Sequence, residues 1–116
     1  MISCGVDLVK IDRIKKAEKL YNKLFTDYEL EHFSKLKDSV ESMAGTFAAK
    51  EAFAKTFNKG LEFIEFKEIE VRHTELHAPY FVFYGQTKRE IEENNYNFSL
   101  SISHDGDYAI AYVIKY

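Results

Sequence analysis

Three charged residues lie in a largely apolar stretch of the chain, Ala44 to Phe57. At about 100° per residue, apolar side chains surround this stretch nearly completely, as in a helix buried inside a protein. Glu51 and Lys55 share one strip of the helix, and Lys50 points between apolar neighbours. Because buried charges need partners or a ligand, two interpretations stay open: a helix-surface ion pair worth about 0.2–0.5 kcal/mol or a functional site.

Two other polar residues fall within strand-like segments. Asp7 interrupts an alternating segment, Ile2 to Val9, in which Ile2, Cys4, Val6 and Leu8 occupy the opposite face. We expect Asp7 at an edge or facing solvent, although Gly5 beside it permits close approach of a backbone or ligand. His104 ends a strand at Asp105-Gly106, a strong hairpin signal between alternating runs. A single turn histidine is usually structural or solvated.

Helix signals indicate how these residues are positioned. A capping box, Thr26-Asp27-Tyr28-Glu29, predicts a helix to about Leu36. Asp38-Ser39-Val40-Glu41 repeats that signature before the central helix, which we expect to stop near Asn58 with Gly60 as its left-handed cap. Periodicity also predicts a short polar helix and five strands. Their approximate ranges are 86–94 for the helix and 2–9, 67–72, 80–84, 98–104 and 108–114 for the strands.

A basic helix is expected after the first strand. Asp12 is placed to cap a helix through about Tyr21, where only Asp12 and Glu18 offset the cations. These cations are Arg13, Lys15, Lys16, Lys19 and, just beyond, Lys23. The helix either presents a solvated face or forms a docking surface for an acidic partner.

Length and composition restrict the class of protein. The 116 residues fit one domain, 1–116, without linkers or repeats. A net charge of −3 and a pI near 5.8 disfavour general nucleic-acid binding. The longest apolar run, Tyr108 to Ile114, is too short to span a membrane, and the only cysteine, Cys4, can form no intrachain disulfide. With no secretory signal pattern at the N-terminus, we expect a soluble cytoplasmic protein.

Three segments occur together in order and spacing: Gly5-Val6-Asp7 in the first strand, Phe47 to Lys55 in the central helix, and Ser101-Ile102-Ser103-His104 at the final hairpin. Their conjunction resembles the holo-acyl-carrier-protein synthase family of short phosphopantetheinyl transferases. The resemblance extends over essentially the whole chain. A lone Lys-Glu-Ala-x-x-Lys pattern would be much less specific.

The resemblance implies transfer of the 4′-phosphopantetheine group from coenzyme A to a serine of an acidic apo acyl carrier protein, of fatty-acid or secondary-metabolite synthesis. Adenosine 3′,5′-bisphosphate would be released. It also implies Mg²⁺, an α+β fold with a small antiparallel-rich sheet around the central buried helix, and a homotrimer whose sites lie between protomers. One alternative is a catalytically silent relative that binds coenzyme A or a carrier protein. Another is a structural oligomer whose buried charges merely pair.

The same resemblance gives roles to the charged residues. Asp7 and Glu51 would hold Mg²⁺, which prefers oxygen ligands and usually takes one or two carboxylates. Lys55 would place a cation beside the diphosphate, because phosphoryl transfer depends on positioning and charge stabilisation. Lys50 either supports the coenzyme A site or pairs structurally with an acid. The proton acceptor for the attacking serine is either Glu51 or a water on the metal that Asp7 holds.

Further roles follow by analogy. Ser103 and His104 are expected to line the coenzyme A pocket from the adjacent protomer. Arg13 and Lys16 are the best candidates for docking the acidic carrier protein, with an attraction that weakens with salt.

Two positions depart from the family pattern by lacking a basic residue. Thr46 stands just before the Phe of the helix motif, and the chain has His77-Ala78-Pro79 where many members have Gly-Lys-Pro. Both changes remove cations that could meet coenzyme A phosphates. His77 or Lys59 is a hypothetical substitute, and an unchanged coenzyme A KM on mutating each would exclude it.

Overall fold

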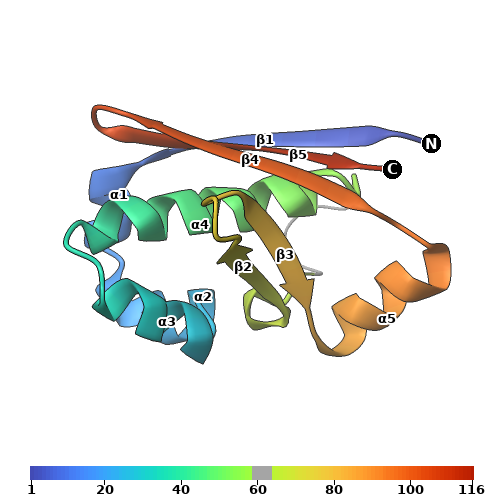
Figure 1. Cartoon of the computed structure of the whole chain (residues 1–116), viewed down its shortest axis with the longest axis horizontal. Helices are drawn as coiled ribbons and strands as arrows, with labels where there is room; N and C mark the ends of the chain where they lie inside the picture. Colours follow the sequence, from blue (N-terminus) through green and yellow to red (C-terminus); the bar gives the residue numbers. More distant parts are fainter. Residues whose placement is uncertain (59–63) are drawn as a thin grey trace.

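The central helix α4 (Ser39–Lys55) lies between two layers in the computed structural model, which describes residues 1–58 and 64–116 (Figure 1). One layer is an antiparallel sheet with strand order β1-β5-β4, and the other contains short helices and the antiparallel hairpin β2-β3. The predicted α+β fold with antiparallel sheets around a buried helix is therefore confirmed. No helix among the described residues is long and apolar enough to cross a membrane.

The remaining elements follow the predicted order. The strands are β1 (Ser3–Lys10), β2 (Ile69–His73), β3 (Pro79–Phe83), β4 (Phe98–Asp105) and β5 (Tyr108–Lys115). The other helices are α1 (Ile11–Lys15), α2 (Tyr21–Leu24), α3 (Asp27–Ser34) and α5 (Gly85–Asn94), with 3₁₀ turns at Glu18–Leu20 and Phe66–Glu68. The polar helix and the final hairpin are confirmed. β2 starts two residues later than predicted because the turn at Phe66–Glu68 precedes it.

Small residues allow α4 to pack closely on the sheet. Every residue from Ala44 to Ala54 is buried, as the apolar pattern predicted. A Cβ atom on Gly5 would lie 2.0 Å from the carbonyl oxygen of Ala52, so glycine is required where β1 crosses the helix. On the other side of α4, the Phe53 ring packs against Phe81, Phe83 and Phe98 with centroid distances of 5.5, 5.2 and 5.0 Å.

The predicted basic helix from Asp12 to Tyr21 is wrong. The chain instead forms α1, a 3₁₀ turn and α2. The Tyr21 hydroxyl donates to the carbonyl of Ile14 at 2.9 Å, and Ile14 is buried. These contacts hold the chain in a bend where a continuous helix would run straight. Asp12 also does not cap α1, which starts after Lys10; its carboxylate pairs with Lys16 at 2.9 Å.

The two predicted caps of α3 and α4 differ. The capping box of α3 is confirmed, because Thr26 and Glu29 exchange both hydrogen bonds, although the helix ends at Ser34. Asp38 occupies the N-cap position of α4 but its side chain makes no capping bond. The left-handed residue after α4 is Asn58, at φ 57°, and the predicted cap Gly60 lies outside the described residues.

The prediction that Asp7 lies at an edge or faces solvent is wrong. Val6 and Leu8 point outward and are exposed, whereas Asp7 points toward α4 and is buried on the same face as Val9. Alternation separates the two faces of a strand but does not say which one the helix covers. The small residues Ala109 and Ala111 on β5 lie on the inner face, so they leave room there for α4.

Candidate active site

Asp7 and Lys55 meet where β1 passes over the C-terminal part of α4. The Asp7 side chain is almost completely buried, and Lys55 Nζ donates to its Oδ1 at 3.0 Å and to the Val6 carbonyl at 2.9 Å. The second carboxylate oxygen, Oδ2, is buried, and no hydrogen bond to it is made by the described residues when the nearby carboxyls are ionised. Buried polar atoms are nearly always satisfied in native proteins, so this oxygen indicates a place for a ligand.

Glu51 lies one helical turn before Lys55 and is also buried beside Asp7. The pKa of the Glu51 carboxyl is raised to about 7, and burial is the largest cause. Asp7 adds to this shift, because its charge repels the Glu51 anion and it can accept a hydrogen bond from the protonated form. Arg13 and Lys55 partly oppose the shift through their positive charges. The two carboxyls therefore share a site that favours either a proton or another cation.

The donor set fits Mg²⁺ in number and kind. Two carboxylates, Asp7 and Glu51, come from a strand and a helix that pack together. The described residues contain no group of three or more His, Cys, Asp or Glu able to hold a metal ion. Mg²⁺ usually takes one or two carboxylates and completes its shell with substrate phosphates and water. Such an ion would bond the open Asp7 oxygen and offset the repulsion between the two carboxylates that contributes to the raised pKa of Glu51.

Lys50 is held by protein groups on the other side of α4. Its Nζ atom is 0% exposed and donates to the Glu29 carboxylate at 2.6 Å and to the carbonyls of Leu24 and Phe66 at 2.7 and 3.0 Å. An ammonium has three donors, so all of them are used. Of the two alternatives for Lys50, direct contact with coenzyme A or a structural pairing, this geometry favours the pairing.

His104 and Ser103 lie away from the carboxylates of the same protomer. The His104 ring packs over Gly45, and its Nε2 is 3.1 Å from the Glu41 carbonyl oxygen. Gly45 precedes Glu51 by six residues, which corresponds to roughly 9 Å along a helix. Ser103 is exposed on the outer face of β4, opposite Ile110. One protomer therefore does not bring these residues to Asp7.

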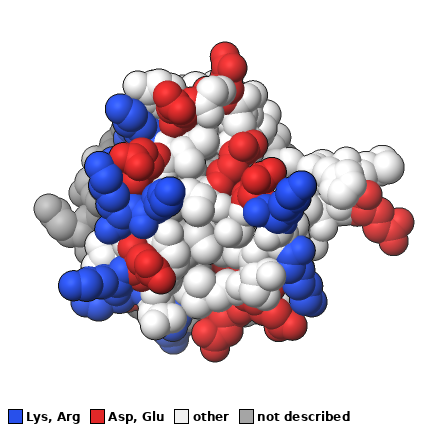
Figure 2. Space-filling view, turned by 90° about the vertical axis from the view of Figure 1, so that its left-hand side faces the viewer, with Lys and Arg blue, Asp and Glu red and all other residues white. Residues whose placement is uncertain are grey.

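Arg13 and Lys16 differ in their surroundings. The Arg13 guanidinium lies 5.6 Å from the centre of the Phe47 ring, and its charge reaches Glu51. Lys16 is exposed and pairs with Asp12. Figure 2 shows the end of the molecule at the left of Figure 1, where Lys and Arg groups alternate with Asp and Glu groups. Arg13 thus adjoins the carboxylate site, and the surface around it is mixed in charge.

The positions that lack family cations are separated in the fold. Thr46 is buried in α4, whereas His77 and Ala78 are exposed in the turn between β2 and β3. His77 has a φ of 68°, in the left-handed region. Lys59 lies outside the described residues. His77 is therefore the candidate substitute that solvent can reach.

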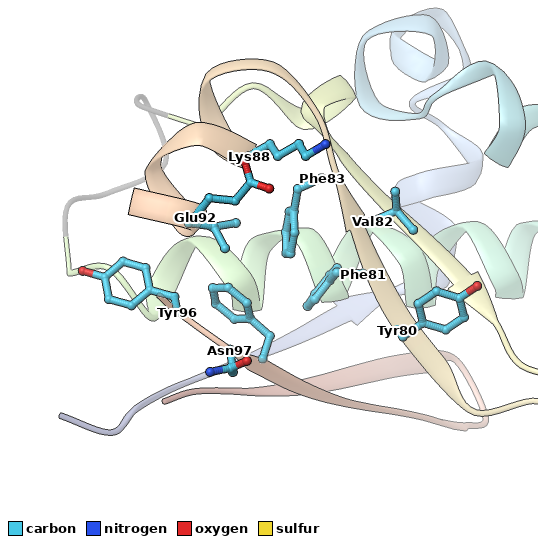
Figure 3. Close-up of a pocket in the computed structure, with 10 residues that line it drawn as sticks. Tyr80, Phe81, Val82, Phe83, Lys88, Glu92, Tyr96 and Asn97 are labelled. Atoms are coloured by element: carbon cyan, nitrogen blue, oxygen red, sulfur yellow. The ribbon is translucent and has the colours of Figure 1, made fainter. Parts of the chain in front are cut away.

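A hollow lies between β3, α5 and the start of β4 (Figure 3), with a volume of about 480 Å³. Its walls include Tyr80, Phe83 and Tyr96, with Lys88 and Glu92 from α5. None of Asp7, Glu51 and Lys55 lines it. The hollow is thus separate from the carboxylate site.

The sequence pattern missed two buried acids, Glu29 and Glu70. Glu29 was recognised only as part of a capping box, and Glu70 only as the polar member of an alternating strand. Glu70 accepts hydrogen bonds from Thr26, Arg72 and Tyr84. Lys50 is the signal that could have identified Glu29, because a lysine in an apolar helix needs an acidic partner.

Comparisons with known proteins agree with this geometry. A model of the 4′-phosphopantetheinyl transferase superfamily matches residues 3–113. A holo-[acyl-carrier-protein] synthase of Halothermothrix orenii is 40% identical, over 95% of this chain and 93% of the relative. The crystal structure of the Neisseria meningitidis synthase has a TM-score of 0.92 at 31% identity, covering 100% of this chain and 99% of that one.

A further solved structure contains a ligand. The Helicobacter pylori holo-[acyl-carrier-protein] synthase in complex with coenzyme A has a TM-score of 0.83 at 32% identity, with both chains fully covered. The family model spans nearly the whole chain, and the relatives match over almost their full length. The chain belongs to the holo-[acyl-carrier-protein] synthase family of 4′-phosphopantetheinyl transferases.

Proposed function

We propose that this protein transfers 4′-phosphopantetheine from coenzyme A to a serine of an acidic apo acyl carrier protein, with Mg²⁺. The observation that carries the proposal is the pair of buried carboxylates, Asp7 and Glu51, beside Lys55 in a chain of this family. The Asp7 oxygen that accepts no hydrogen bond from the described part of the chain supports a metal ligand there. Coenzyme A is the ligand in the complex of the Helicobacter pylori relative, which supports the donor substrate.

The reaction needs few groups from the protein. The serine oxygen attacks the phosphorus that carries the pantetheine, the bond from that phosphorus to the bridging oxygen breaks, and adenosine 3′,5′-bisphosphate leaves with that oxygen. Bound Mg²⁺, held by Asp7 and Glu51, would supply positive charge at the diphosphate. Lys55 uses two of its three donors on Asp7 and Val6, and its side chain is half exposed, so the third can reach the leaving diphosphate.

The serine proton needs an acceptor at the moment of attack. Glu51 is one candidate, because a general base works best when its pKa lies near the working pH and the pKa of Glu51 is about 7. A water oriented by Asp7 is the other. The two alternatives differ in which substitution removes the base, Glu51→Gln or Asp7→Asn.

Carrier docking is assigned to the basic segment before α3. Between Lys10 and Lys23 the chain has six basic residues and two acidic ones. Arg13 lies nearest the carboxylate site, and Lys16 lies one turn further along the surface. An acidic carrier would be attracted over a longer range, and the association rate would fall with salt.

We further propose a homotrimer with its active sites between protomers, acting in the cytoplasm. The outer face of the β1-β5-β4 sheet supports this, because it exposes large apolar side chains in neighbouring strands. These are Val6, Leu8, Tyr108, Ile110 and Tyr112. An exposed apolar patch on a soluble protein usually marks an interface. A second protomer on this face would also explain how Ser103 and His104 reach a carboxylate pair.

The transfer is tested by the mass of an apo acyl carrier protein after incubation with this protein, coenzyme A and Mg²⁺. A gain of one phosphopantetheine group, absent with EDTA and with Asp7→Ala or Glu51→Ala, is expected. Folded protein that gives no mass gain with several carrier proteins would reject the transferase in favour of a silent binder.

The trimer is tested separately by sedimentation. Leu8→Glu places a charge in the middle of the apolar outer face and is expected to give monomers without transfer activity. Lys35→Glu, a charge change at an exposed residue outside the docking segment, is the matched control and should leave the assembly and the transfer intact. A monomeric wild-type protein with full activity would contradict the inter-subunit site.

A further inference from the structure

Lys50 bonds α4 to two chain segments that are distant in sequence. Its ammonium donates to the Leu24 carbonyl at the end of α2 and to the Phe66 carbonyl before β2. These acceptors are 26 and 16 residues away. The last carbonyls of a helix have no donor within the helix. Lys50 supplies that donor to α2 from another element.

Glu29 connects Lys50 to α3 and β2. Its Oε1 accepts from Lys50 and from the Thr26 backbone, and its Oε2 accepts from the Val71 backbone at 2.7 Å. Glu29 and Lys50 are both essentially fully buried. One carboxylate thus ties the start of α3, the middle of β2 and the helix α4 together.

The segment from Ile11 to Leu24 needs such anchoring. It contains two α-helices of five and four residues and a 3₁₀ turn of three. Isolated helices shorter than about 12–15 residues are marginal in water. One end of the segment is held by Ile14, which is buried, and by Arg13 over Phe47 of α4. The other end is held by the packing of Tyr21 and Leu24 against the core and by the bond from Lys50 to the Leu24 carbonyl.

Lys50 and Glu51 are adjacent on one helix but face different layers. Glu51 faces Asp7 of β1, and Lys50 faces the end of α2. A helix of 17 residues is a rigid spacer, so the bond from Lys50 to Leu24 fixes the end of the segment 11–24 relative to Glu51. We propose that Lys50 is a positioning residue that fixes the carrier-docking segment 11–24 relative to the carboxylates that perform the transfer.

This inference deepens the proposed function and rests on it. Docking cations that sit on a loosely held segment would bind the carrier more weakly and present its serine out of line. Misplacement by about 1 Å can cost roughly 10²-fold in rate. Coenzyme A binding, which uses the other side of α4, would be largely unaffected. A purely structural role would instead lower stability and leave the affinity for the carrier unchanged in the molecules that fold.

The test compares Glu29→Gln with the double variant Glu29→Gln/Lys50→Met. Burial already lowers the pKa of Lys50, so without the Glu29 charge its amine can be neutral and still donate to Leu24 and Phe66. Glu29→Gln therefore removes the ion pair but keeps the two carbonyl bonds. The double variant removes those bonds as well, and it leaves no unpaired charge in the core.

Four quantities are measured at a temperature where both variants are folded: the unfolding midpoint, the Kd for coenzyme A, the Kd for an apo carrier whose target serine is alanine, and kcat and KM for the intact carrier. Both variants are expected to lose stability. Only the double variant should weaken carrier binding, by about tenfold, and lower kcat/KM for the carrier by roughly 10-fold to 100-fold. The Kd for coenzyme A should stay within about twofold.

The controls separate the possible outcomes. Lys35→Met removes an exposed lysine paired with Glu31 and should change none of the four quantities. Equal losses of carrier affinity in both Glu29 variants, or no loss in either, would overturn the positioning role. If Lys50→Met prevents folding, Lys50→Gln in the Glu29→Gln background replaces it with the same expected direction. Wild-type protein without transfer would contradict the proposed function itself, which is a different result.

Discussion

Two pairs of buried acids lie on different sides of helix α4, and they differ in how fully their oxygens are bonded. Asp7 on β1 and Glu51 on α4 lie side by side, and when both carboxyls are ionised one Asp7 oxygen bonds Lys55 while the other has no partner among the described residues. Glu29 lies on α3 and Glu70 lies on β2. Each of their oxygens accepts at least one hydrogen bond.

Glu29 and Glu70 differ in the direction in which their surroundings shift the pKa. Burial raises the pKa of Glu29, opposed by Lys50, which is in direct contact. Burial also acts on Glu70, but hydrogen bonds from Thr26, Arg72 and Tyr84 outweigh it and lower the pKa of that carboxyl. Protein groups alone therefore satisfy the hydrogen bonding of these two carboxylates.

The difference separates acids with a structural role from acids proposed to bind a ligand within a single fold. A buried acid with a full set of donors has nothing left to offer a ligand, whereas an acid with an open oxygen beside a second carboxyl does. All four acids are buried, so burial by itself does not mark the candidate site. Completeness of hydrogen bonding is the property that marks Asp7 and Glu51 as the candidate site.

We call Asp7 and Glu51 the open pair, because one Asp7 oxygen accepts no hydrogen bond from the described residues. The largest expected effect follows from removing an acid of this open pair. Asp7→Asn and Glu51→Gln should each lower the transfer rate by about 10²–10⁴-fold, since each removes a group proposed to hold the metal or take the proton. Glu51→Gln should not lower the free energy of unfolding at pH 8, because it relieves repulsion with Asp7. Steady-state transfer to a carrier protein and urea unfolding measure the two quantities.

The matched control for this prediction is an acid outside both pairs. Glu31→Gln changes an exposed residue on α3 and should leave rate and stability within about 0.5 kcal/mol of wild type. A Glu51→Gln variant that loses stability but keeps its rate would mean that the Asp7–Glu51 pair is structural too.

Glu29 and Glu70 form the closed pair, because each of their oxygens accepts a hydrogen bond. This closed pair should show the opposite behaviour. Lys50→Met leaves the Glu29 carboxylate buried without its counter-ion, and breaking such a pair costs about 3–5 kcal/mol. We expect that loss in the free energy of unfolding, measured in urea, with no change in Mg²⁺ affinity of the folded protein. Removing Lys55, whose side chain is half exposed, should cost much less stability. Equal losses for both lysines would remove the distinction between the two pairs.

Much of the fold could be predicted from local pattern. The apolar periodicity located α4, the capping box located the start of α3, and Asp105-Gly106 located the final hairpin. These are short-range signals, in which each residue interacts with neighbours a few positions away. The family motif added the roles of Asp7, Glu51 and Lys55.

Other features depend on partners that are distant in sequence. The burial of Asp7 could not be predicted, because a strand pattern does not say which face receives a helix. Lys50 was visibly out of place, but its acceptors at Leu24, Glu29 and Phe66 are brought together only by the tertiary fold. The break in the predicted basic helix likewise depends on a hydroxyl of Tyr21 reaching back seven residues.

A smaller effect is the pH dependence of stability without metal. A carboxyl whose pKa rises from 4.5 to about 7 on folding binds more protons in the folded chain between these values. In EDTA, the contribution of Glu51 is therefore greatest below pH 4.5 and is lost as the pH rises through 7. The total loss is about 3 kcal/mol at most. Urea unfolding at stepped pH should give a smaller slope for Glu51→Gln than for wild type.

Saturating Mg²⁺ provides the control for the pH experiment. An ion that binds both carboxylates displaces the shared proton, so apparent affinity should rise as the pH increases toward 7 and above. The slope of stability with pH should flatten or reverse in its presence. A slope that Mg²⁺ leaves unchanged would show that the proton and the metal do not compete for the same acids.

The smallest expected effect comes from Thr26, the residue that links the two closed acids. Its backbone donates to Glu29 and its hydroxyl donates to Glu70, while the same hydroxyl caps α3. Thr26→Val keeps the shape but removes the hydroxyl, and loss of an N-cap costs about 1–2 kcal/mol.

The loss should appear in the free energy of unfolding and not in Mg²⁺ affinity, since Glu70 lies across α4 from Asp7. Ser34→Ala, which removes an exposed hydroxyl from the same helix, should cost less than about 0.5 kcal/mol. If Thr26→Val weakened Mg²⁺ binding by more than its effect on stability, the closed pair would be coupled to the open one. The two sides of α4 would then have to be treated as one electrostatic unit.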